Sequence, residues 1–563
     1  MSVPQRHKSL GRAEIIFVLL ASLFVFVIMG GLATLNPCNV AWLLADNDFA
    51  AHYLGWEYFR HTPLWQYPLG ANPQCGLEIA SSIIYTDSIP LMAFAFRTVN
   101  ALLPEPFQYF GLWLLLCCLL QTYLALHIAR ELTADRINAS LIALFFLIAP
   151  IFIWRSACHM SLTTHWLLLC GLWFFLRPRF ARNAWIILMA VAAMIHIYFL
   201  PMLGALLLAD VIRRSIDHTE TPRALIPTCI AAPVIAIALL AVAGVFTIPV
   251  QGLRLTQAKW FSVSLASIID PNDRFSTILP NLPIYDPYSE GFAFLGIGVI
   301  VLAIIAIVAI IVAQMRRPNR PRQRFRAHIV LLAILAILFT LIALSSNVRL
   351  FRKDILIYSW GPFDAISEMF RAIGRMFWLP YYIIYIGIFA ALCHTLPRRA
   401  LSVLVAMMLI LQLYDSRNAF VLCVEKHKTK TWQSPMQDPF WEQAPLRYTK
   451  VRVVPPSSSS EPPWKELAQY ACSHHMGINS FYFARSDENR LALEDKRMIQ
   501  VIEGQSAFDP DALYVVTHSN PMIWKLIKER ASQNDTVREI DGFRIVAPGA
   551  NSTTESLESK EER

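Results

Sequence analysis

Long apolar runs constrain this chain more than any other feature of its sequence. Residues 14–35 and 291–314 each reach the roughly 20 apolar residues that a membrane-spanning helix needs. Hydrophobic residues make up 56% of the chain and charged residues 16%, whereas soluble domains lie nearer roughly one half and one quarter. The first run is too long for a removable signal peptide and has no small-residue cleavage site. We therefore expect an α-helical polytopic membrane protein.

The net charge of +9 does not indicate nucleic-acid binding. The basic residues cluster beside apolar runs, as in 177–182, 316–326 and 397–399, which is typical of cytoplasmic loops. No basic stripe with interleaved aromatic residues lies on a soluble segment, so we exclude nucleic acid as a partner. Lys8 and Arg12 precede the first run, which predicts a cytoplasmic N-terminus and an extracytoplasmic residue 36.

The other apolar runs predict the topology. We expect about eleven spans and a first outer loop, residues 36–106, that is too long for a simple connection. Within that loop, residues 88–103 are short and polar enough to form an interfacial helix that does not cross the membrane. The predicted spans are 14–35, 107–129, 137–154, 161–176, two half-length helices in 183–212, 223–249, 291–314, 327–345, 376–395 and 398–414.

The two half-length helices keep Arg213 and Arg214 on the cytoplasmic side. Pro201 favours a break between them at residues 196–201.

The chain becomes polar after Asp415, which predicts a division into a membrane domain (1–414), a linker (415–463) and a small α/β domain (464–548). The linker interpretation rests on the stretch PPSSSSEPP. WKELAQYACSHH favours a helix, and ALYVVTH and GFRIVAP favour strands. With an odd number of spans this domain is extracytoplasmic, and we expect the acidic tail, 549–563, to be disordered.

Acidic residues follow the first span directly. Asp46 and Asp48 lie in ADNDFAAHYLGW, and His52 shares a helical face with Asp48 if this segment is helical. A carboxylate at the bilayer surface can act as a general base toward an acceptor hydroxyl. The alternative is that Asn47 or Asp48 only caps a helix. Glu78 and Asp87 are weaker candidates in the same loop.

Two histidines lie between predicted spans, in CHMSLTTHW. His159 and His165 flank hydroxyl side chains at the edge of the membrane, where polar groups are costly unless they serve a cavity. They are therefore candidates for substrate binding. The alternative for each is a structural histidine.

Basic residues in the predicted outer loop 346–378 break the positive-inside trend. Arg352, Arg371 and Arg375 are candidates for binding phosphate, because the guanidinium fork matches its geometry. Arg371 and Arg375 are expected on one helical face, four positions apart. The alternatives are attraction to anionic lipid headgroups, or pairing with Asp364 and Glu368.

The acids of the loop 251–290 do not define a metal site. Asp270, Asp273 and Asp286 lie in stretches such as DPND and YDPY, which turn chemistry explains. Glu290 ends the same loop. A divalent metal is compatible with these residues but nothing supports it, so we expect no cofactor.

Cysteine spacing gives no zinc motif. If the outer side is oxidising, Cys38 could pair with Cys75, and Cys423 with Cys472.

These elements together resemble the GT-C superfamily of integral-membrane glycosyltransferases, and more narrowly an uncharacterised family of bacterial GT-C-like membrane proteins. The resemblance covers almost the whole chain. It is carried by DFAAHYLGWEYFR, PLGANP, YTDSIPL, FQYFGLW, CHMSLTTHW, FRAIGRMFWLPYY and ACSHHMGINSFYFAR.

The resemblance implies transfer of a sugar from a polyprenyl-phosphate donor to an envelope glycan or lipid acceptor on the extracytoplasmic face of the bacterial inner membrane. Asp48 carries over as the catalytic acid/base, with Asp46 as its alternate in a relaxed Asp-x-Asp pattern. His52, His159, His165, Arg352, Arg371 and Arg375 stay candidates for substrate binding. Membrane lipids are further partners.

Two other classes of protein remain open. A transporter or flippase of a lipid-linked saccharide would share the basic groove but would not need Asp48, and the sequence has no internal repeat of the kind that many transporters show. A non-catalytic component of an envelope-polysaccharide assembly would use the outer domain to bind a partner.

Overall fold

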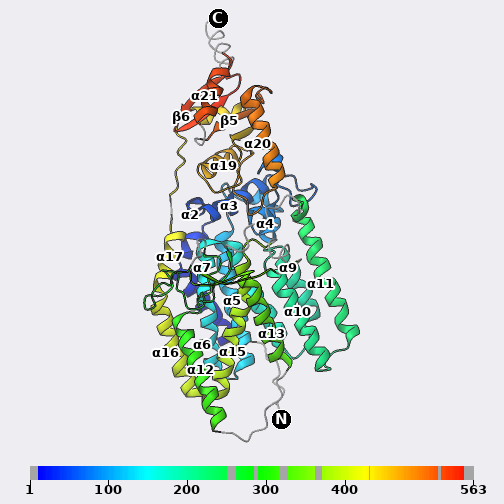
Figure 1. Cartoon of the computed structure of the whole chain (residues 1–563), viewed down its shortest axis with the longest axis vertical. Coiled ribbons are helices and arrows are strands. Elements are labelled where there is room, and N and C mark those ends of the chain that lie inside the picture. The colour runs from blue at the N-terminus through cyan, green and yellow to red at the C-terminus, as the bar shows by residue number, and fades with distance from the viewer. Residues whose placement is uncertain are drawn as a thin grey trace. The chain divides into compact units, whose positions relative to one another are not determined.

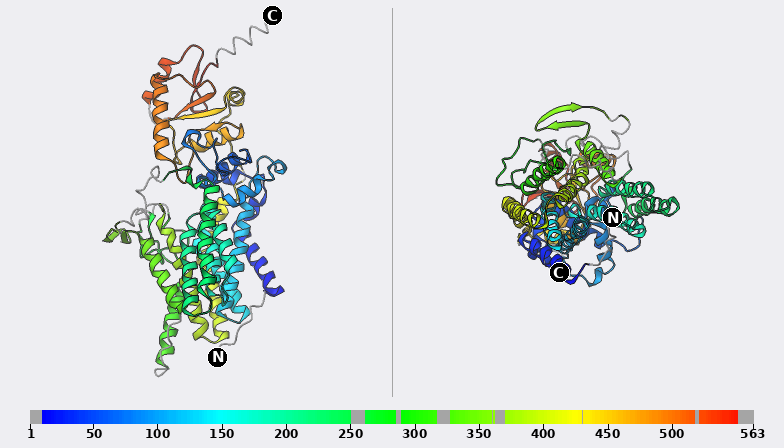
Figure 2. Two further views of the ribbon diagram at one scale, coloured as in Figure 1. Left: turned by 90° about the vertical axis from the view of Figure 1, so that its right-hand side faces the viewer. Right: turned by 90° about the horizontal axis from the view of Figure 1, so that it is seen from below.

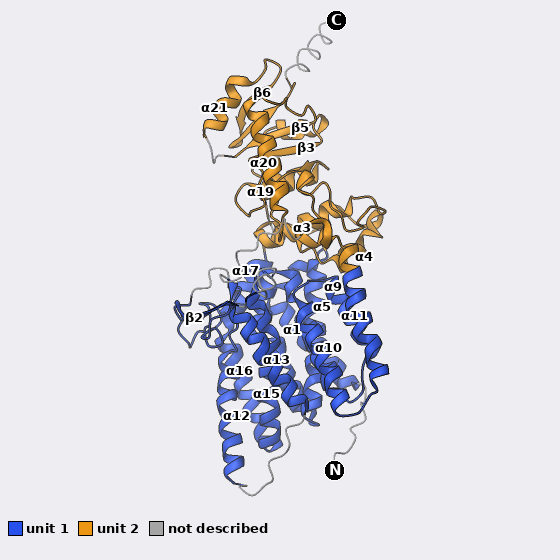
Figure 3. Ribbon diagram, turned by 45° about the vertical axis from the view of Figure 1, so that its right-hand side comes forward, with its two compact units in different colours: residues 1–37, 109–238, 255–428 blue, residues 38–108, 239–254, 429–563 orange. Residues whose placement is uncertain are grey.

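The computed structural model describes residues 10–249, 261–284, 289–316, 327–359, 361, 370–429, 431–517 and 521–550. The chain forms two compact units (Figure 3). Unit 1 comprises residues 1–37, 109–238 and 255–428, and unit 2 comprises residues 38–108, 239–254 and 429–563. The loop 36–106, predicted to lie outside the membrane and called the first outer loop here, therefore shares unit 2 with the C-terminal region, apart from residues 36–37. The sequence predicts the two as separate parts.

Unit 1 is built from apolar helices (Figure 1). Five helices are long and apolar enough to cross a membrane, or up to seven if each of two bent pairs is one span, among the described residues. The protein is thus a multi-pass membrane protein, and the total of about eleven spans stays a prediction. The helices are α1 (Arg12–Ile28), α5 (Phe110–Leu132), α6 (Arg136–Leu147), α7 (Pro150–Cys158), α8 (Trp166–Leu176), α9 (Arg182–Ala193), α10 (Phe199–Ile216), most of α11 (Pro222–Val242), α12 (Ile297–Met315), α13 (Ala327–Leu344), α15 (Trp378–Thr395), α16 (Arg398–Asp415) and α17 (Arg417–His427).

Several predicted spans are interrupted. The run 137–154 is divided into α6 and α7, which meet at a 41° bend where Pro150 begins α7. The run 183–212 forms two helices as predicted, but Pro201 lies in the first turn of α10 and not in the break. In a first helical turn the missing N–H of proline costs no hydrogen bond. These interruptions matter because their backbone turns place polar side chains at helix ends.

The first outer loop in unit 2 contains short helices. They are α2 (Ala41–Leu44), α3 (Asn47–Arg60), η2 (Leu77–Ile79), η3 (Ile83–Thr86), α4 (Pro90–Arg97) and η4 (Asn100–Leu102). The helix predicted at 88–103 is present as α4 and η4. Gly55 lets α3 approach η3, because a Cβ at this position would lie 2.3 Å from Thr86.

The C-terminal part of unit 2 holds a five-stranded sheet with order β4-β3-β5-β7-β6. β3, β4 and β5 are parallel, and β7 and β6 continue the sheet antiparallel. The predicted helix and both predicted strands are present as α19, β5 and β7. The elements are α18 (Phe440–Gln443), β3 (Lys450–Val454), α19 (Trp464–Ser473), β4 (Gly477–Ile478), α20 (Glu488–Glu503), β5 (Ala512–Val516), α21 (Pro521–Arg530), β6 (Thr536–Ile540) and β7 (Phe543–Ala547).

Residues 415–463, predicted as a linker, are largely structured. They contain α17 and also β3, which pairs with both β4 and β5. Because β3 is buried in the sheet, its valines reflect a core strand, and only the stretch after Val454 has the composition of a linker.

Backbone and charge contacts join the first outer loop to this sheet. Ile478 donates to the carbonyl of Gln74 at 3.0 Å, and Gly76 donates to the carbonyl of Ile478 at 2.8 Å. Glu78, a weak candidate for chemistry from sequence, accepts from Arg452 Nη2 at 2.7 Å. Glu78 is therefore an ion-pair partner of a sheet residue.

The cysteine pairs suggested by sequence do not form. None of the ten cysteines, all of which lie among the described residues, forms a disulfide. Cys75 is buried beside Ile478, whereas Cys38 is exposed. Cys423 belongs to unit 1, where its thiol contacts the carbonyl of Ile153 at 3.7 Å, while Cys472 belongs to unit 2.

Candidate active site

A buried cluster of charges lies in unit 1, where α7 ends and α15 begins. Arg155 comes from α7, Arg375 from the 3-10 helix η10 (Ile373–Phe377), and Glu290 from the segment before α12. Glu290 Oε2 accepts from Arg155 Nη2 at 2.7 Å and from Arg375 Nε at 2.8 Å. Its Oε1 accepts from Arg375 Nη2 at 2.7 Å. One carboxylate is thus shared by two guanidinium groups.

Among the described residues, this cluster holds two guanidinium groups and one carboxylate in a water-poor environment. The side chains of Arg155 and Arg375 are 4% and 8% exposed, and that of Glu290 is 14% exposed. Burial opposes ionisation of Glu290, but the two guanidinium groups outweigh it and hold the pKa of this carboxyl well below its usual range. Glu290 is therefore ionised at neutral pH and balances one of the two positive charges.

His159 lies within the field of this cluster. Burial, reinforced by the positive charges of Arg375 and Arg155, lowers the pKa of His159 well below its ordinary value. The imidazole is therefore neutral at pH 7 and can accept or donate a hydrogen bond. Its Nδ1 lies 3.2 Å from Ser161 Oγ. The substrate-binding role of His159 stays a prediction.

The break between α9 and α10 contributes two residues that sequence reasoning passed over. The ring of His196 lies 6.0 Å from that of His159, between ring centroids. Tyr198 Oη accepts from the backbone N–H of Ala372 at 2.7 Å, and Arg375 lies 4.7 Å above its ring. The signal was present, since HIYFLP interrupts an apolar run with polar rings.

His165 contacts the cluster indirectly, through Trp378. Its ring packs against that of Trp378 with the centroids 4.5 Å apart and the planes tilted by 36°. The guanidinium of Arg155 lies 5.3 Å from the centroid of the same Trp378 ring. Its Nδ1 lies 2.9 Å from Tyr382 Oη, which also accepts from Gln121 Nε2 at 3.1 Å. These contacts are those expected of a structural histidine, because His165 supports the tryptophan that packs against Arg155.

Arg371 and Arg352 depart from the predicted geometry. Arg371 precedes η10 and is half-buried, with its guanidinium 5.6 Å from the Phe261 ring. The regular helix begins only at Trp378, so Arg371 and Arg375 do not share an α-helical face. Arg352 is exposed between two strands and takes no part in the buried network, as far as the described residues show. Asp364 and Glu368 lie outside the described residues.

The acidic residues of the first loop form a second group, in unit 2. Asp46 is the N-cap of α3 and accepts from the N–H groups of Asp48 and Phe49 at 3.0 and 3.4 Å. The capping role expected for Asn47 or Asp48 therefore falls to Asp46. Asp48 lies half-buried in the first helical turn, and His52 follows one turn later, 2% exposed.

Asp87, a weak candidate from sequence, lies close to His52 of this group. A carboxylate oxygen of Asp87 and a ring nitrogen of His52 lie within 4.8 Å of each other. Asp87 adopts a left-handed conformation, with φ of 53°, at the end of η3. Ser88 Oγ donates to the carbonyl of His52 at 2.7 Å and fixes this turn against α3. The residues Asp46, Asp48, His52 and Asp87 are called the acidic group below.

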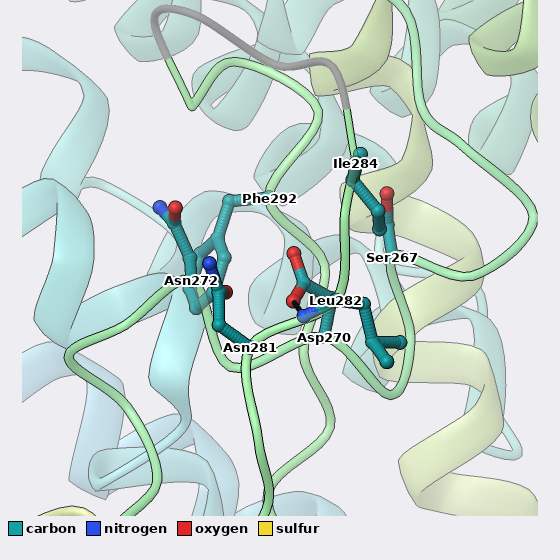
Figure 4. Close-up of a pocket in the computed structure, with 7 residues that line it drawn as sticks. All are labelled: Ser267, Asp270, Asn272, Asn281, Leu282, Ile284 and Phe292. Carbon is teal, nitrogen blue, oxygen red and sulfur yellow. Dashed lines mark hydrogen bonds between the residues drawn. The ribbon is translucent and has the colours of Figure 1, made fainter. Parts of the chain in front are cut away.

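A cavity in the loop before α12 is too small for substrate (Figure 4). Its volume is about 40 Å³, space for about one water molecule. Asp270 accepts from the backbone N–H of Leu282 at 2.9 Å, the bond drawn dashed in Figure 4. Burial raises the pKa of Asp270. The cavity is lined by Ser267, Asp270, Asn272, Asn281, Leu282, Ile284 and Phe292. The expectation that Asp270 and Asp273 serve turn structure fits this arrangement, and Asp286 lies outside the described residues.

Comparison with known proteins gives two family matches. The family described as "Domain of unknown function (DUF6311)" matches residues 19–417, and "DUF6311 C-terminal domain" matches residues 440–548. A comparison with curated proteins gives no match.

Solved structures match over most of the chain at low identity. ArnT from Cupriavidus metallidurans in the apo state is 13% identical, with 96% of this chain and 99% of that chain covered and a TM-score of 0.45. ArnT bound to undecaprenyl phosphate is 14% identical, with 94% and 97% covered and a TM-score of 0.41. The archaeal oligosaccharyltransferase AglB from Archaeoglobus fulgidus, in complex with an inhibitory peptide and a dolichol-phosphate, is 11% identical, with 90% and 69% covered and a TM-score of 0.42.

Proposed function

The chain belongs to the family described as a domain of unknown function (DUF6311), and we propose that it is a membrane glycosyltransferase of the GT-C type. In this proposal a sugar moves from a polyprenyl-phosphate donor to a glycan or lipid acceptor on the extracytoplasmic face of the bacterial inner membrane. The C-terminal domain is extracytoplasmic and the N-terminus cytoplasmic.

The observation that carries the proposal is the shared carboxylate of the charge cluster. Two nearly buried guanidinium groups, Arg155 and Arg375, share the carboxylate of Glu290. Buried guanidinium groups favour anions beside them, because the low dielectric strengthens the attraction. Guanidinium groups bind phosphate through paired N–H donors. Arg371 and neutral His159 supply further donors to a phosphate group at this site.

The acidic group of unit 2 supplies the base in this proposal. Asp48 removes the proton from an acceptor hydroxyl while the hydroxyl oxygen attacks the anomeric carbon. The bond between that carbon and the phosphate oxygen breaks, and polyprenyl phosphate leaves as an anion. Asp46 holds the helix that carries Asp48, and His52 with Asp87 completes the polar lining.

The experiment measures release of polyprenyl phosphate from a panel of polyprenyl-phosphate sugars by purified protein. We expect release by the wild type and a loss of at least about 100-fold in Asp48→Asn, the lower range for removing a general base. Glu466→Gln is the matched control, because Glu466 is also a half-buried acid in the first turn of a unit 2 helix. It should retain full activity.

Two outcomes would reject parts of the proposal. Equal release by wild type and Asp48→Asn would remove Asp48 from the mechanism. Absence of release from every donor, together with movement of lipid-linked sugar across liposomes, would reject the transferase and favour the transporter class.

A further inference from the structure

A two-stranded hairpin follows a candidate span in unit 1. β1 (Asn347–Leu350) pairs antiparallel with β2 (Lys353–Ile357), and Leu350 faces Lys353 across the turn. Phe351 and Arg352 form the tip. Phe351 has φ of +56°, which is unfavourable for a bulky side chain. Two-residue turns usually place Asn or Gly there, so this tip keeps an aromatic residue at a conformational cost.

Among the described residues of unit 1, contacts outside the hairpin hold β1 and leave β2 exposed. Leu265 donates its N–H to the carbonyl of Arg349 at 2.9 Å, and Arg349 Nη2 donates to Ser262 Oγ at 2.7 Å. Val348 is buried. β2, in contrast, is exposed at all five positions. Figure 2 shows the two strands projecting to the side of the helices of unit 1.

The exposed strand is apolar on both of its faces. Ile355, Leu356 and Ile357 are 53%, 56% and 72% exposed, and successive strand residues point to opposite faces. In water such a strand is an aggregation site, and an isolated two-stranded hairpin is only marginally stable. A hairpin designed for water would alternate polar and apolar residues instead. The composition therefore calls for an apolar environment around β2.

The position of the hairpin identifies that environment. α13, which is long and apolar enough to span a membrane, ends at Leu344, and only Ser345 and Ser346 precede β1. Such a short connection covers about 10 Å, so the hairpin starts where the span leaves the membrane. Its tip carries Arg352 and Lys353, both exposed, next to the exposed ring of Phe351. Basic and aromatic residues together are typical of elements at the membrane interface.

We propose that the hairpin 347–357 is a membrane-interface anchor for anionic phospholipid. Phe351 and the apolar residues of β2 enter the boundary between headgroups and acyl chains, and Arg352 with Lys353 binds the phosphate groups of anionic headgroups. This inference does not depend on the glycosyltransferase proposal. It replaces the substrate-binding role predicted for Arg352 with one of the alternatives, attraction to lipid headgroups.

A lipid surface explains the hairpin better than a second copy of the chain would. A protein partner would cover one face of β2, whereas both faces are apolar. The basic tip complements an anionic lipid surface, and Asp354 is the only acidic residue of the hairpin. An adjoining candidate span also guarantees that lipid is present at this point.

The test uses the photoreactive residue p-benzoylphenylalanine at single positions of the full chain, reconstituted in vesicles of phosphatidylcholine with phosphatidylglycerol. The test positions are Phe351 and Ile357. Ile337, 62% exposed on α13, is the positive reference for lipid contact, and Leu446, 88% exposed near α18, is the negative reference. After irradiation, mass spectrometry identifies the adducts. We expect phospholipid adducts at 351 and 357 with yields close to that at 337, and none at 446.

A separate experiment tests whether Arg352 and Lys353 bind the headgroups. With the photoreactive residue at 351, Arg352→Gln and Lys353→Gln should each lower the yield of phosphatidylglycerol adduct by about fivefold, the contribution of one basic residue near an anionic surface. Phosphatidylcholine adducts should change little. Adducts with a second copy of the chain, or no adduct at 351 and 357 while 337 reacts, would overturn the anchor. Unchanged phosphatidylglycerol yields in both glutamine variants would overturn the headgroup assignment.

Discussion

Replacing Glu290 with glutamine removes the carboxylate that Arg155 and Arg375 share, while keeping the size of the side chain. The three hydrogen bonds of 2.7, 2.8 and 2.7 Å use both carboxylate oxygens, whereas the amide of glutamine keeps one acceptor oxygen and presents an N–H donor in place of the other. Two guanidinium groups then remain nearly buried after losing the carboxylate that they share. The folded state should therefore be less stable.

The magnitude follows from the charges. Each arginine attracts the carboxylate by about 4 kcal/mol for charge centres roughly 4 Å apart at an effective dielectric constant of about 20. Desolvation of the carboxylate offsets several kcal/mol of this attraction. The net loss on breaking a buried pair is about 3–5 kcal/mol, and we expect Glu290→Gln to lower the free energy of unfolding by that amount.

The assay follows unfolding in detergent micelles with a thiol-reactive dye, because several cysteines, such as Cys117, Cys118 and Cys423, are buried and react only when the helices separate. The matched control is Glu425→Gln. Glu425 pairs with Arg274 at 3.9 Å, with both side chains more than half exposed, and such a pair contributes at most about 1 kcal/mol. Equal, small destabilisation in both variants would refute the reasoning that the Glu290 carboxylate neutralises a buried charge.

A second readout of the same variant tests the phosphate site. Removing the carboxylate frees N–H donors on both arginines and adds one unit of positive charge to the site. Binding of undecaprenyl phosphate should therefore become tighter in Glu290→Gln and should protect it from unfolding more than it protects the wild type. Weaker protection would argue that the cluster is purely structural.

The remaining predictions concern unit 2. Arg452→Met should lower the free energy of unfolding of this unit, measured by chemical denaturation, by about 3–5 kcal/mol, because Arg452 is 1% exposed and pairs with Glu494 and Glu78 at 2.7 Å. The control is Arg497→Met, at a residue that is 48% exposed. It should change the free energy of unfolding by less than about 1 kcal/mol. Burial opposes ionisation of Glu78, but its bonds to Arg452 outweigh this and lower its pKa from 4.5 to about 2. A carboxyl whose pKa is lowered by folding stabilises the folded state at pH values above its unfolded pKa. The stabilisation by Glu78 should therefore fade as the pH falls from about 4.5 toward 2. The Glu78→Gln variant should lose less stability across that window than the wild type loses.

Local sequence signals predicted the parts of the fold that depend on local chemistry. Apolar runs located the helices of unit 1, and short β-branched runs located β5 and β7. The sequence also indicated the polar turn at His159 and the acids after the first span, because polar residues at the edge of a membrane are costly unless they have a function. The stretch ADND offered several candidates for one cap, and only the backbone geometry assigns it to Asp46.

Contacts between distant residues were not predictable in the same way. Glu290 meets arginines 135 and 85 positions away, and no single-residue property of Glu290 distinguishes it from the turn-forming acids of its loop. Arg155 was overlooked because one arginine at the end of an apolar helix is equally typical of a side chain that extends to the membrane interface. The exposure of Arg352 similarly depends on a hairpin whose apolar sequence resembles a buried strand.

The union of the first outer loop with the C-terminal sheet affects how the chain is made. Glu78 and Arg452 are 374 positions apart. At a synthesis rate of about 5–20 residues per second, the loop waits roughly 20–75 s for the strand that completes it. During that interval the edge around Gln74 to Glu78 has no sheet to join, so folding of unit 2 must follow translation rather than accompany it. A chain truncated before residue 429 would leave the loop in that unfinished state permanently.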